Sequence, residues 1–194
     1  SGSLENWMDY EDPRPDASRT RLLTLETLLT TILDFSGTIE LAIETKHPVR
    51  FGKYVERELF DVLHRYGLTT PQDGNDFPRA RVMSFSQMAV QRFKRYSPET
   101  QVVYLAGKLP RRFRGGHLPQ GVSICGIDIH YIKEHPEYVQ QVHAFGHKVH
   151  VWTVDEMADV DLCLQLGVDA IITNHPGDVI ARVKKWNPLS APVV

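Results

Sequence analysis

Apolar positions recur along this chain in two alternating periods, that of a helix and that of a strand. Leucine and isoleucine residues between 25 and 35 recur every three or four positions, which is the spacing of one buried helix face. In the next segment, residues 38–44, apolar residues alternate with threonine and glutamate in the two-residue period of a strand. We therefore expect a helix over 25–35, capped by Thr24 or Thr20, and then a strand over 38–44.

The same change of period repeats towards the carboxyl end and predicts six strands, most of them separated by helices. The predicted strands span 38–44, 81–84, 101–105, 123–129, 148–153 and 168–173. The predicted helices span 25–35, 52–66, 86–95, 132–145, 155–166 and 177–185, with Pro176 opening the last one. A basic loop holding Lys108, Arg111, Arg112 and Arg114 follows the third strand. Strands that alternate with helices predict a parallel sheet with right-handed crossovers.

Two architectures fit this order of elements, an open doubly wound sheet and a barrel. No glycine-rich nucleotide fingerprint supports the open sheet. Short strands followed by charged or aromatic residues favour a barrel whose site is built from loops. A complete barrel of this kind has about 250 residues and eight strands. The expected fold is therefore an α/β, TIM-type (β/α) barrel that is incomplete, with about six of its eight βα units.

The expected domain organisation follows from where the periodic pattern starts and stops. Residues 1–21 are polar and proline-rich and predict an arm or loop. Residues 22–186 form the partial barrel domain, and 187–194 form a tail. Because the early strands of a complete barrel are missing from this chain, we expect the gene to encode a region upstream of it. The partial barrel would otherwise have two open sheet edges, which favour self-association.

Composition narrows the class of protein without identifying it. The chain has 22 Lys+Arg and 24 Asp+Glu residues, so its net charge of −2 gives no indication of a nucleic-acid partner. No apolar run approaches the roughly 20 residues of a transmembrane helix, and no signal sequence is visible. Cys125 and Cys163 form neither a CxxC pair nor a zinc motif, which suits reduced thiols and a cytoplasmic location.

Four short motifs stand out along the chain. They are Leu-Thr-Leu-Glu at 23–26, Glu-Leu-Ala-Ile-Glu-Thr-Lys-His-Pro at 40–48, Met-Ser-Phe at 83–85, and a closing pair of strands at 149–155 and 167–176. In this order and at this spacing, they resemble the glycerophosphodiester phosphodiesterase family. The second motif resembles the family's Glu-x-Lys strand end, and the closing pair resembles its WTV and GVD-IIT segments. The resemblance covers roughly residues 22–185.

The resemblance implies a hydrolase that cleaves a small-molecule glycerophosphodiester into glycerol 3-phosphate and an alcohol. It implies a divalent cation, Ca²⁺ or Mg²⁺, with Glu44 as a metal ligand at the end of a barrel strand. It also implies five substrate-binding residues, namely Lys46, Ser84, Phe85, Trp152 and His175. Lys46 would meet a phosphate oxygen, and Trp152 would stack on the glycerol moiety or form a wall of its pocket.

The residues taken alone leave other interpretations open. Glu44 can be a surface carboxylate paired with Lys46, and Lys46 can be a solvated lysine. Trp152 can belong to the core, as tryptophan often does. The basic loop can attract an anionic substrate or simply face solvent.

The chain also departs from the family pattern. The His-Arg, Glu-x-Asp and His-Asp motifs of the family's first strands do not occur upstream of residue 22, so we expect no catalytic histidine within this chain. Asn174 stands where many members have aspartate. A second hypothesis is therefore a non-catalytic barrel fragment that acts as a binding or assembly module. Another phosphate-binding barrel enzyme is a third, which the Glu-x-Lys and WTV segments argue against.

Overall fold

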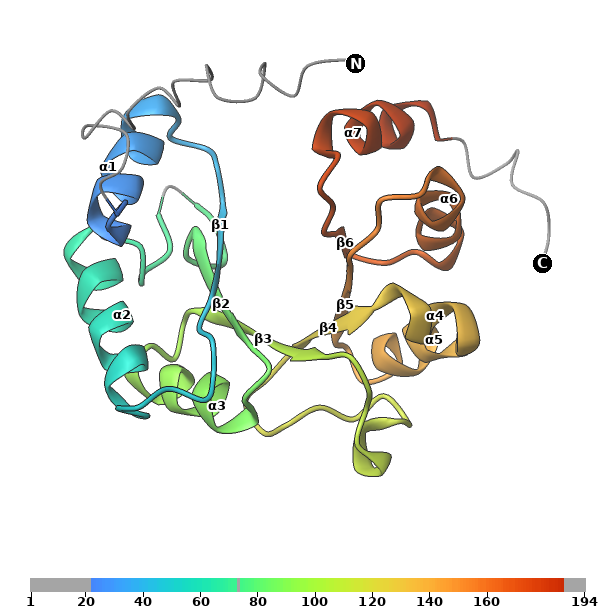
Figure 1. The fold of residues 1–194 in the computed structure, drawn as a ribbon, viewed down its shortest axis with the longest axis horizontal. Coiled ribbons are helices and arrows are strands. Elements are labelled where there is room, and N and C mark those ends of the chain that lie inside the picture. Colours follow the sequence, from blue (N-terminus) through green and yellow to red (C-terminus); the bar gives the residue numbers. More distant parts are fainter. Residues whose placement is uncertain (1–21, 73, 187–194) are drawn as a thin grey trace, which may run out of the picture. The chain divides into compact units, whose positions relative to one another are not determined.

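A computed structural model of the protein describes residues 22–72 and 74–186 (Figure 1). The predicted arm at 1–21 and tail at 187–194 lie outside these residues. The chain divides into two compact units, Ser1–Ile39 and Glu40–Val194. Within the part of the chain that the structure describes, no helix is long and apolar enough to cross a membrane.

The first unit contains helix α1, Leu25–Phe35. Thr24 caps it, because its side-chain oxygen accepts a hydrogen bond of 3.2 Å from the backbone N–H of Thr27. The helix ends at Ser36, whose backbone N–H donates to the carbonyl of Ile32. The prediction of this helix is confirmed at both ends, and of the two candidate caps Thr24 is the one used.

The second unit is built on a sheet of six parallel strands. The strands are β1 (Leu41–Glu44), β2 (Ala80–Ser84), β3 (Gln101–Ala106), β4 (Ile124–Asp128), β5 (Lys148–Trp152) and β6 (Ala170–Ile171). Their spatial order is their order in the sequence, without the reversal that defines a doubly wound sheet. The strand order therefore confirms the incomplete barrel.

Helices connect most of the strands. They are α2 (Tyr54–Arg65), α3 (Gln87–Tyr96), α4 (Ile129–Glu134), α5 (Glu137–His143), α6 (Met157–Leu166) and α7 (Pro176–Lys185), with a short 3₁₀ helix, η1 (Arg111–Phe113), in the basic loop. The prediction of one helix over 132–145 is wrong, since α4 and α5 are separate. Pro136 explains the break, because proline has no N–H to donate and disfavours helical backbone at His135 before it.

The two faces of the sheet carry different side chains. On the outer face, strand residues such as Val82, Cys125 and Val151 are buried beneath the helices, and the Tyr138 hydroxyl of α5 donates to the Cys125 sulfur. The inner face holds a small apolar cluster of Val103, Leu105 and Ile124, with Met83 and Trp152 packed against it. Side chains alternate along each strand, so register assigns every strand residue to one of these faces.

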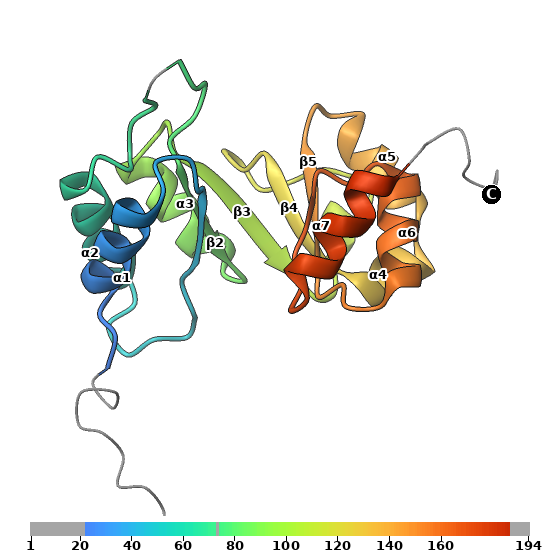
Figure 2. The same cartoon turned by 90° about the horizontal axis from the view of Figure 1, so that it is seen from above.

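All strands point the same way, so their carboxyl ends share one edge of the sheet. Figure 2 shows the loops after β1, β2, β5 and β6 leaving on the same side, the lower side in that view. Barrel enzymes build their sites at this edge. The predicted site residues therefore belong to a common region of the fold.

Candidate functional site

Glu44 ends β1 at the carboxyl edge and lies on the inner face. It is in register with Met83, which packs on the inner cluster, and paired residues of neighbouring strands point to the same side. Its side chain is 27% exposed, and its Oε2 lies 3.6 Å from the Nζ of the far more exposed Lys46. The structure thus brings together the predicted metal ligand and the predicted phosphate-binding cation at the inner edge.

Ser84 fastens the end of β1 to the end of β2. Its hydroxyl donates a 2.7 Å hydrogen bond to the carbonyl of Thr45 and accepts a 3.2 Å bond from the N–H of Ser86. The Thr45 N–H in turn donates to the carbonyl of Met83 at 2.8 Å. Ser84 is fully buried on the outer face, so its hydroxyl is occupied by the main chain that holds Glu44 in place.

A buried carboxylate anchors the loop that follows Glu44 and Lys46. Glu56 of α2 has no exposed surface, and its two oxygens lie 2.5 Å from His47 Nε2 and 2.5 Å from Arg92 Nη1 of α3. This network was not predicted from the sequence. The signal was present, because Glu56 shares the helix face of Leu59 and Leu63 by its spacing, and a carboxylate on a buried face needs partners.

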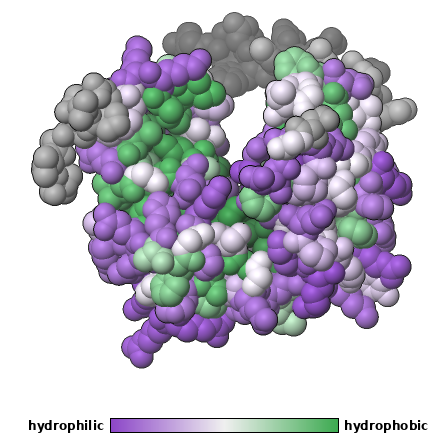
Figure 3. All heavy atoms as spheres, turned by 180° about the vertical axis from the view of Figure 1, so that it is seen from behind, coloured by the Kyte–Doolittle hydropathy of each residue, from purple (hydrophilic) through white to green (hydrophobic). Residues whose placement is uncertain are grey.

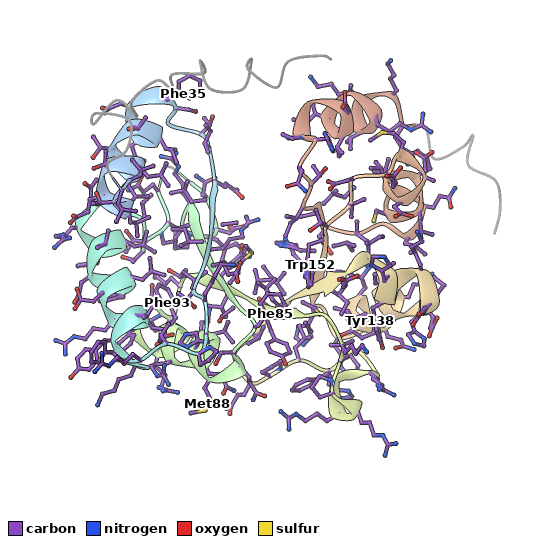
Figure 4. The ribbon with its side chains drawn as sticks, viewed as in Figure 1. Phe35, Phe85, Met88, Phe93, Tyr138 and Trp152 are labelled. Carbon is purple, nitrogen blue, oxygen red and sulfur yellow. The ribbon has the colours of Figure 1, made fainter. Side chains whose placement is uncertain are left out.

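Trp152 and Phe85 form an aromatic pair at the same edge (Figure 4). Their ring centroids are 5.4 Å apart at 81°, an edge-to-face arrangement. Trp152 also packs on the inner apolar cluster, so core packing and pocket wall are compatible roles. Its indole N–H is buried without a hydrogen-bond partner among the described atoms. A buried N–H without a partner at this edge can donate a hydrogen bond to an oxygen of a bound molecule.

Asp155 joins the loop after β5 to the loop after β6. Its carboxylate accepts hydrogen bonds from the Asn174 N–H at 2.8 Å, the Asn174 side-chain amide at 2.9 Å and the Thr173 hydroxyl at 3.0 Å. The bonds from Asn174 hold the pKa of Asp155 below its usual range. Aspartate at 174 would place two carboxylates face to face, whereas the amide found here donates to Asp155.

Besides His47, two further histidines, His130 and His175, follow strand ends. His175 is exposed at the start of α7, and its N–H donates to the Thr173 hydroxyl at 3.0 Å. His130 donates its N–H to Asp128, and its Nδ1 lies 2.8 Å from the same carboxylate oxygen. Asp128 is in register with Trp152 and so faces the inner side. The Asp155 loop thus fixes where His175 stands, while His130 is tied to Asp128.

The described residues do not by themselves make a site for a hard divalent cation. Within 22–72 and 74–186, no group of three or more His, Cys, Asp or Glu side chains is placed to hold a metal. Calcium takes six to eight oxygen ligands, and Glu44 supplies at most two. Glu44 can therefore contribute to such a site but cannot complete it.

The fold and its carboxyl edge define the class of protein, a (β/α)-barrel protein whose site lies in the loops that follow the strands. Within that class, the chain belongs to the Glycerophosphoryl diester phosphodiesterase family, whose model matches residues 6–178. The resemblance seen in the four sequence motifs is thereby confirmed.

Individual relatives agree with this assignment. The chain is 42% identical over 186 residues to a "Probable glycerophosphodiester phosphodiesterase 1" of Mycobacterium tuberculosis, covering 94% of this chain and 66% of that protein. It shares its fold with a glycerophosphodiester phosphodiesterase from Parabacteroides distasonis, with a TM-score of 0.70, 24% identity, and coverage of 83% of this chain and 63% of that one. An Oleispira antarctica phosphodiesterase, solved in complex with the product sn-glycerol-3-phosphate, matches with a TM-score of 0.64, 19% identity, and coverage of 84% and 61%. The chain spans slightly less than two thirds of these relatives.

Proposed function

We propose that this chain forms the larger part of a glycerophosphodiester phosphodiesterase, which hydrolyses glycerophosphodiesters to glycerol 3-phosphate and an alcohol. The names of the relatives and the bound product of the Oleispira protein support this reaction. The observation that carries the proposal is that two pairs, Glu44 with Lys46 and Phe85 with Trp152, belong to the same edge of the sheet. Two charged side chains that can interact with a phosphate and its cation thus lie at the same edge as two aromatic rings that can pack on the carbon atoms of a substrate.

In this proposal each predicted residue has a separate task. Glu44 is one ligand of a divalent cation, Ca²⁺ or Mg²⁺, which when bound withdraws charge from the phosphate oxygens. Lys46 contacts a phosphate oxygen, and the exposed His175 binds at the far side of the substrate. Phe85 and Trp152 pack against the glycerol carbons, and the free indole N–H of Trp152 donates to a substrate oxygen. Ser84 acts indirectly, by positioning Thr45 and hence Glu44.

One structural observation favours the alternative of a non-catalytic binding or assembly module. Among the described residues, Glu44 belongs to no group of three or more side chains placed to hold a metal. A site of this kind can bind a phosphodiester through Lys46 and the aromatic pair without cleaving it.

Release of glycerol 3-phosphate from glycerophosphocholine, with Ca²⁺ or Mg²⁺ added, tests the proposal. We expect a version extended to the full length of the relatives to release the product and to lose that activity on Glu44→Ala substitution. Glu40→Ala is the matched control, because Glu40 pairs with Arg81 at the other end of β1. Full metal-dependent activity in Glu44→Ala would contradict the role of Glu44.

Binding and product-release assays on the 194-residue chain distinguish the two functions. If it binds glycerophosphocholine in calorimetry but releases no product, this chain alone acts as a binding module. The phosphodiesterase activity then belongs only to the extended protein. Failure of the extended protein to release product with either cation would refute the enzymatic proposal altogether.

A further inference from the structure

Three segments follow neighbouring strands, and the first and third of them carry an unusual concentration of positive charge. Residues 46–53 follow β1, 85–88 follow β2, and 108–114 follow β3, and we call these three segments together the basic rim. They contain seven lysine and arginine residues, all exposed, whereas the whole chain has a net charge of −2. No aspartate or glutamate occurs in 45–55, 77–98 or 100–127. The positive charge is therefore concentrated in these stretches of the sequence, where Lys46 is the rim cation paired with Glu44 at 3.6 Å.

Hydrogen bonds connect the segments of the basic rim. The Arg112 guanidinium donates at 2.7 Å to the side chain of Gln87, which ties the third segment to the start of α3. Glu56 links His47 of the first segment to Arg92 of α3. Figure 1 shows the loop after β1, the start of α3 and the 3₁₀ helix of the third segment along the lower edge of the drawing.

Two apolar side chains of the basic rim, Phe51 and Met88, are largely exposed in the part of the chain that the structure describes. Phe51 is 65% exposed and Met88 is 69% exposed. In Figure 4, Met88 points away from the ribbon at its lower edge. The Arg50 guanidinium lies 5.5 Å from the centroid of the Phe51 ring, so the two side chains form a cation–π pair. Exposed apolar groups surrounded by cations are the composition of surfaces that enter the headgroup region of a membrane.

We propose that the basic rim docks the protein on an anionic lipid surface. The charge on the rim attracts anionic headgroups, and Phe51 and Met88 enter the interface between headgroups and acyl chains. A soluble anionic substrate would account for the cations but gives no reason for the exposed apolar side chains. Because the rim borders the carboxyl edge of the sheet, docking brings the candidate site close to lipid-derived phosphodiesters.

Co-sedimentation of the 194-residue chain with vesicles tests this docking without requiring any turnover. Binding is expected to vesicles of phosphatidylcholine mixed with phosphatidylglycerol, to fall as salt is raised, and to be weak with phosphatidylcholine alone. The triple variant Arg50→Gln, Lys53→Gln, Arg111→Gln should lower the partition coefficient roughly a hundredfold, at about fivefold for each cation. None of these residues belongs to the candidate site, so the test is independent of the proposed activity.

Control variants separate docking from general charge effects and from unfolding. Lys184→Gln with Lys185→Gln removes two exposed cations of α7, outside the rim, and should leave binding unchanged. Arg50→Lys with Arg111→Lys keeps the charge and should retain binding. Phe51→Ser with Met88→Ser should weaken binding while keeping its salt dependence.

Three results would overturn the proposal. The first is no binding of the unaltered chain to anionic vesicles. The second is equal loss of binding in the rim and α7 variants. The third is a triple variant that loses affinity for free glycerophosphocholine while vesicle binding is unaffected, which would assign the cations to a soluble substrate.

Discussion

At the scale of single residues, the candidate site depends on polar groups that the mechanism itself does not use. Ser84, Glu56 and Asp155 each hold a segment that carries a predicted site residue. Glu56 is the most constrained, because its carboxylate is buried and each oxygen has its own partner. A buried polar group that loses its partner lowers the free energy of unfolding markedly. Substitutions of these residues and their partners therefore have the largest expected effects.

Replacing Glu56 by alanine should destabilise the protein by about 3–5 kcal/mol, because Arg92 would remain partly buried without its carboxylate. Urea denaturation measures this change. Glu58→Ala, on the exposed side of the same helix, should change the free energy of unfolding by no more than about 0.5 kcal/mol. Equal effects of the two substitutions would show that the buried network does not matter to stability.

His150 should make stability depend on pH. Its side chain is buried on the inner face, and burial, reinforced by the charge of Arg81, lowers its pKa to about 4. In the unfolded chain the pKa is about 6.5, so between these values only the unfolded state takes up the proton. The free energy of unfolding should therefore fall by about 3 kcal/mol as pH drops from 6.5 to 4.

Comparison of His150→Gln with the unaltered protein isolates this effect, since glutamine does not titrate. Denaturation at a series of pH values should show the free energy of unfolding of the unaltered protein falling by about 3 kcal/mol relative to that of His150→Gln between pH 6.5 and 4. A difference that stays constant from pH 6.5 to 4 would contradict a neutral, buried His150.

At the scale of elements, close packing on the inner face depends on a residue without a side chain. Gly126 of β4 is in register with Leu105, and a β-carbon at 126 would collide with the Leu105 side chain and lie 3.1 Å from Val103. Leu105 and Val103 belong to the cluster on which Trp152 packs. The position of the indole thus depends on the absence of one methyl group.

Gly126→Ala should lower stability by about 1–3 kcal/mol, the usual cost of overfilling a packed region. Gly177→Ala is the matched control, because nothing lies within 4 Å of its added carbon and it stands in a helix, where alanine is favoured. Thermal unfolding followed by circular dichroism compares them. A Gly126→Ala protein as stable as the control would show that the inner face is loosely packed.

At the scale of the whole molecule, the sheet has two open sides. Among the described residues, β1 pairs only with β2, and β6 pairs only with β5. The rear face carries hydrophobic areas between hydrophilic ones (Figure 3). Unpaired strand edges recruit other strands, so the proposal that this chain self-associates has a physical basis.

We expect the 194-residue chain to sediment as larger species when its concentration is raised. Sedimentation velocity over a roughly hundredfold concentration range measures this, because association follows mass action. A version extended to the length of the relatives is the control and should stay closer to monomeric, since added strands can cover the edges. A chain that remains monomeric throughout would contradict association through β1 and β6.

Much of the fold could be predicted from the sequence, because local periodicity reports directly on burial. The α1 helix, the six strands and the start of α7 at Pro176 lie within a few residues of their predicted places. The merged prediction of α4 and α5 failed because the apolar period continues through Pro136, whereas the backbone cannot. The strand predicted at 168–173 is reduced to Ala170–Ile171, the two residues that are in register with β5.

The candidate site could be predicted only in part. Motif spacing located Glu44, Lys46, Phe85 and Trp152, and the structure brings them to one edge. Motif spacing could not indicate that Ser84 is buried beneath the helices, or that Glu56 and Asp155 hold neighbouring segments in place. Those facts depend on partners 9 to 39 positions away in the chain.

By itself, the sequence determined the alternation of strands and helices, the family and the identity of the side chains at the strand ends, because each of these is written in local order and spacing. Only the tertiary structure decided which face each strand residue occupies, which loops are tied together and where the cations of the basic rim gather. Register and packing between distant segments set these features, and no local pattern encodes them.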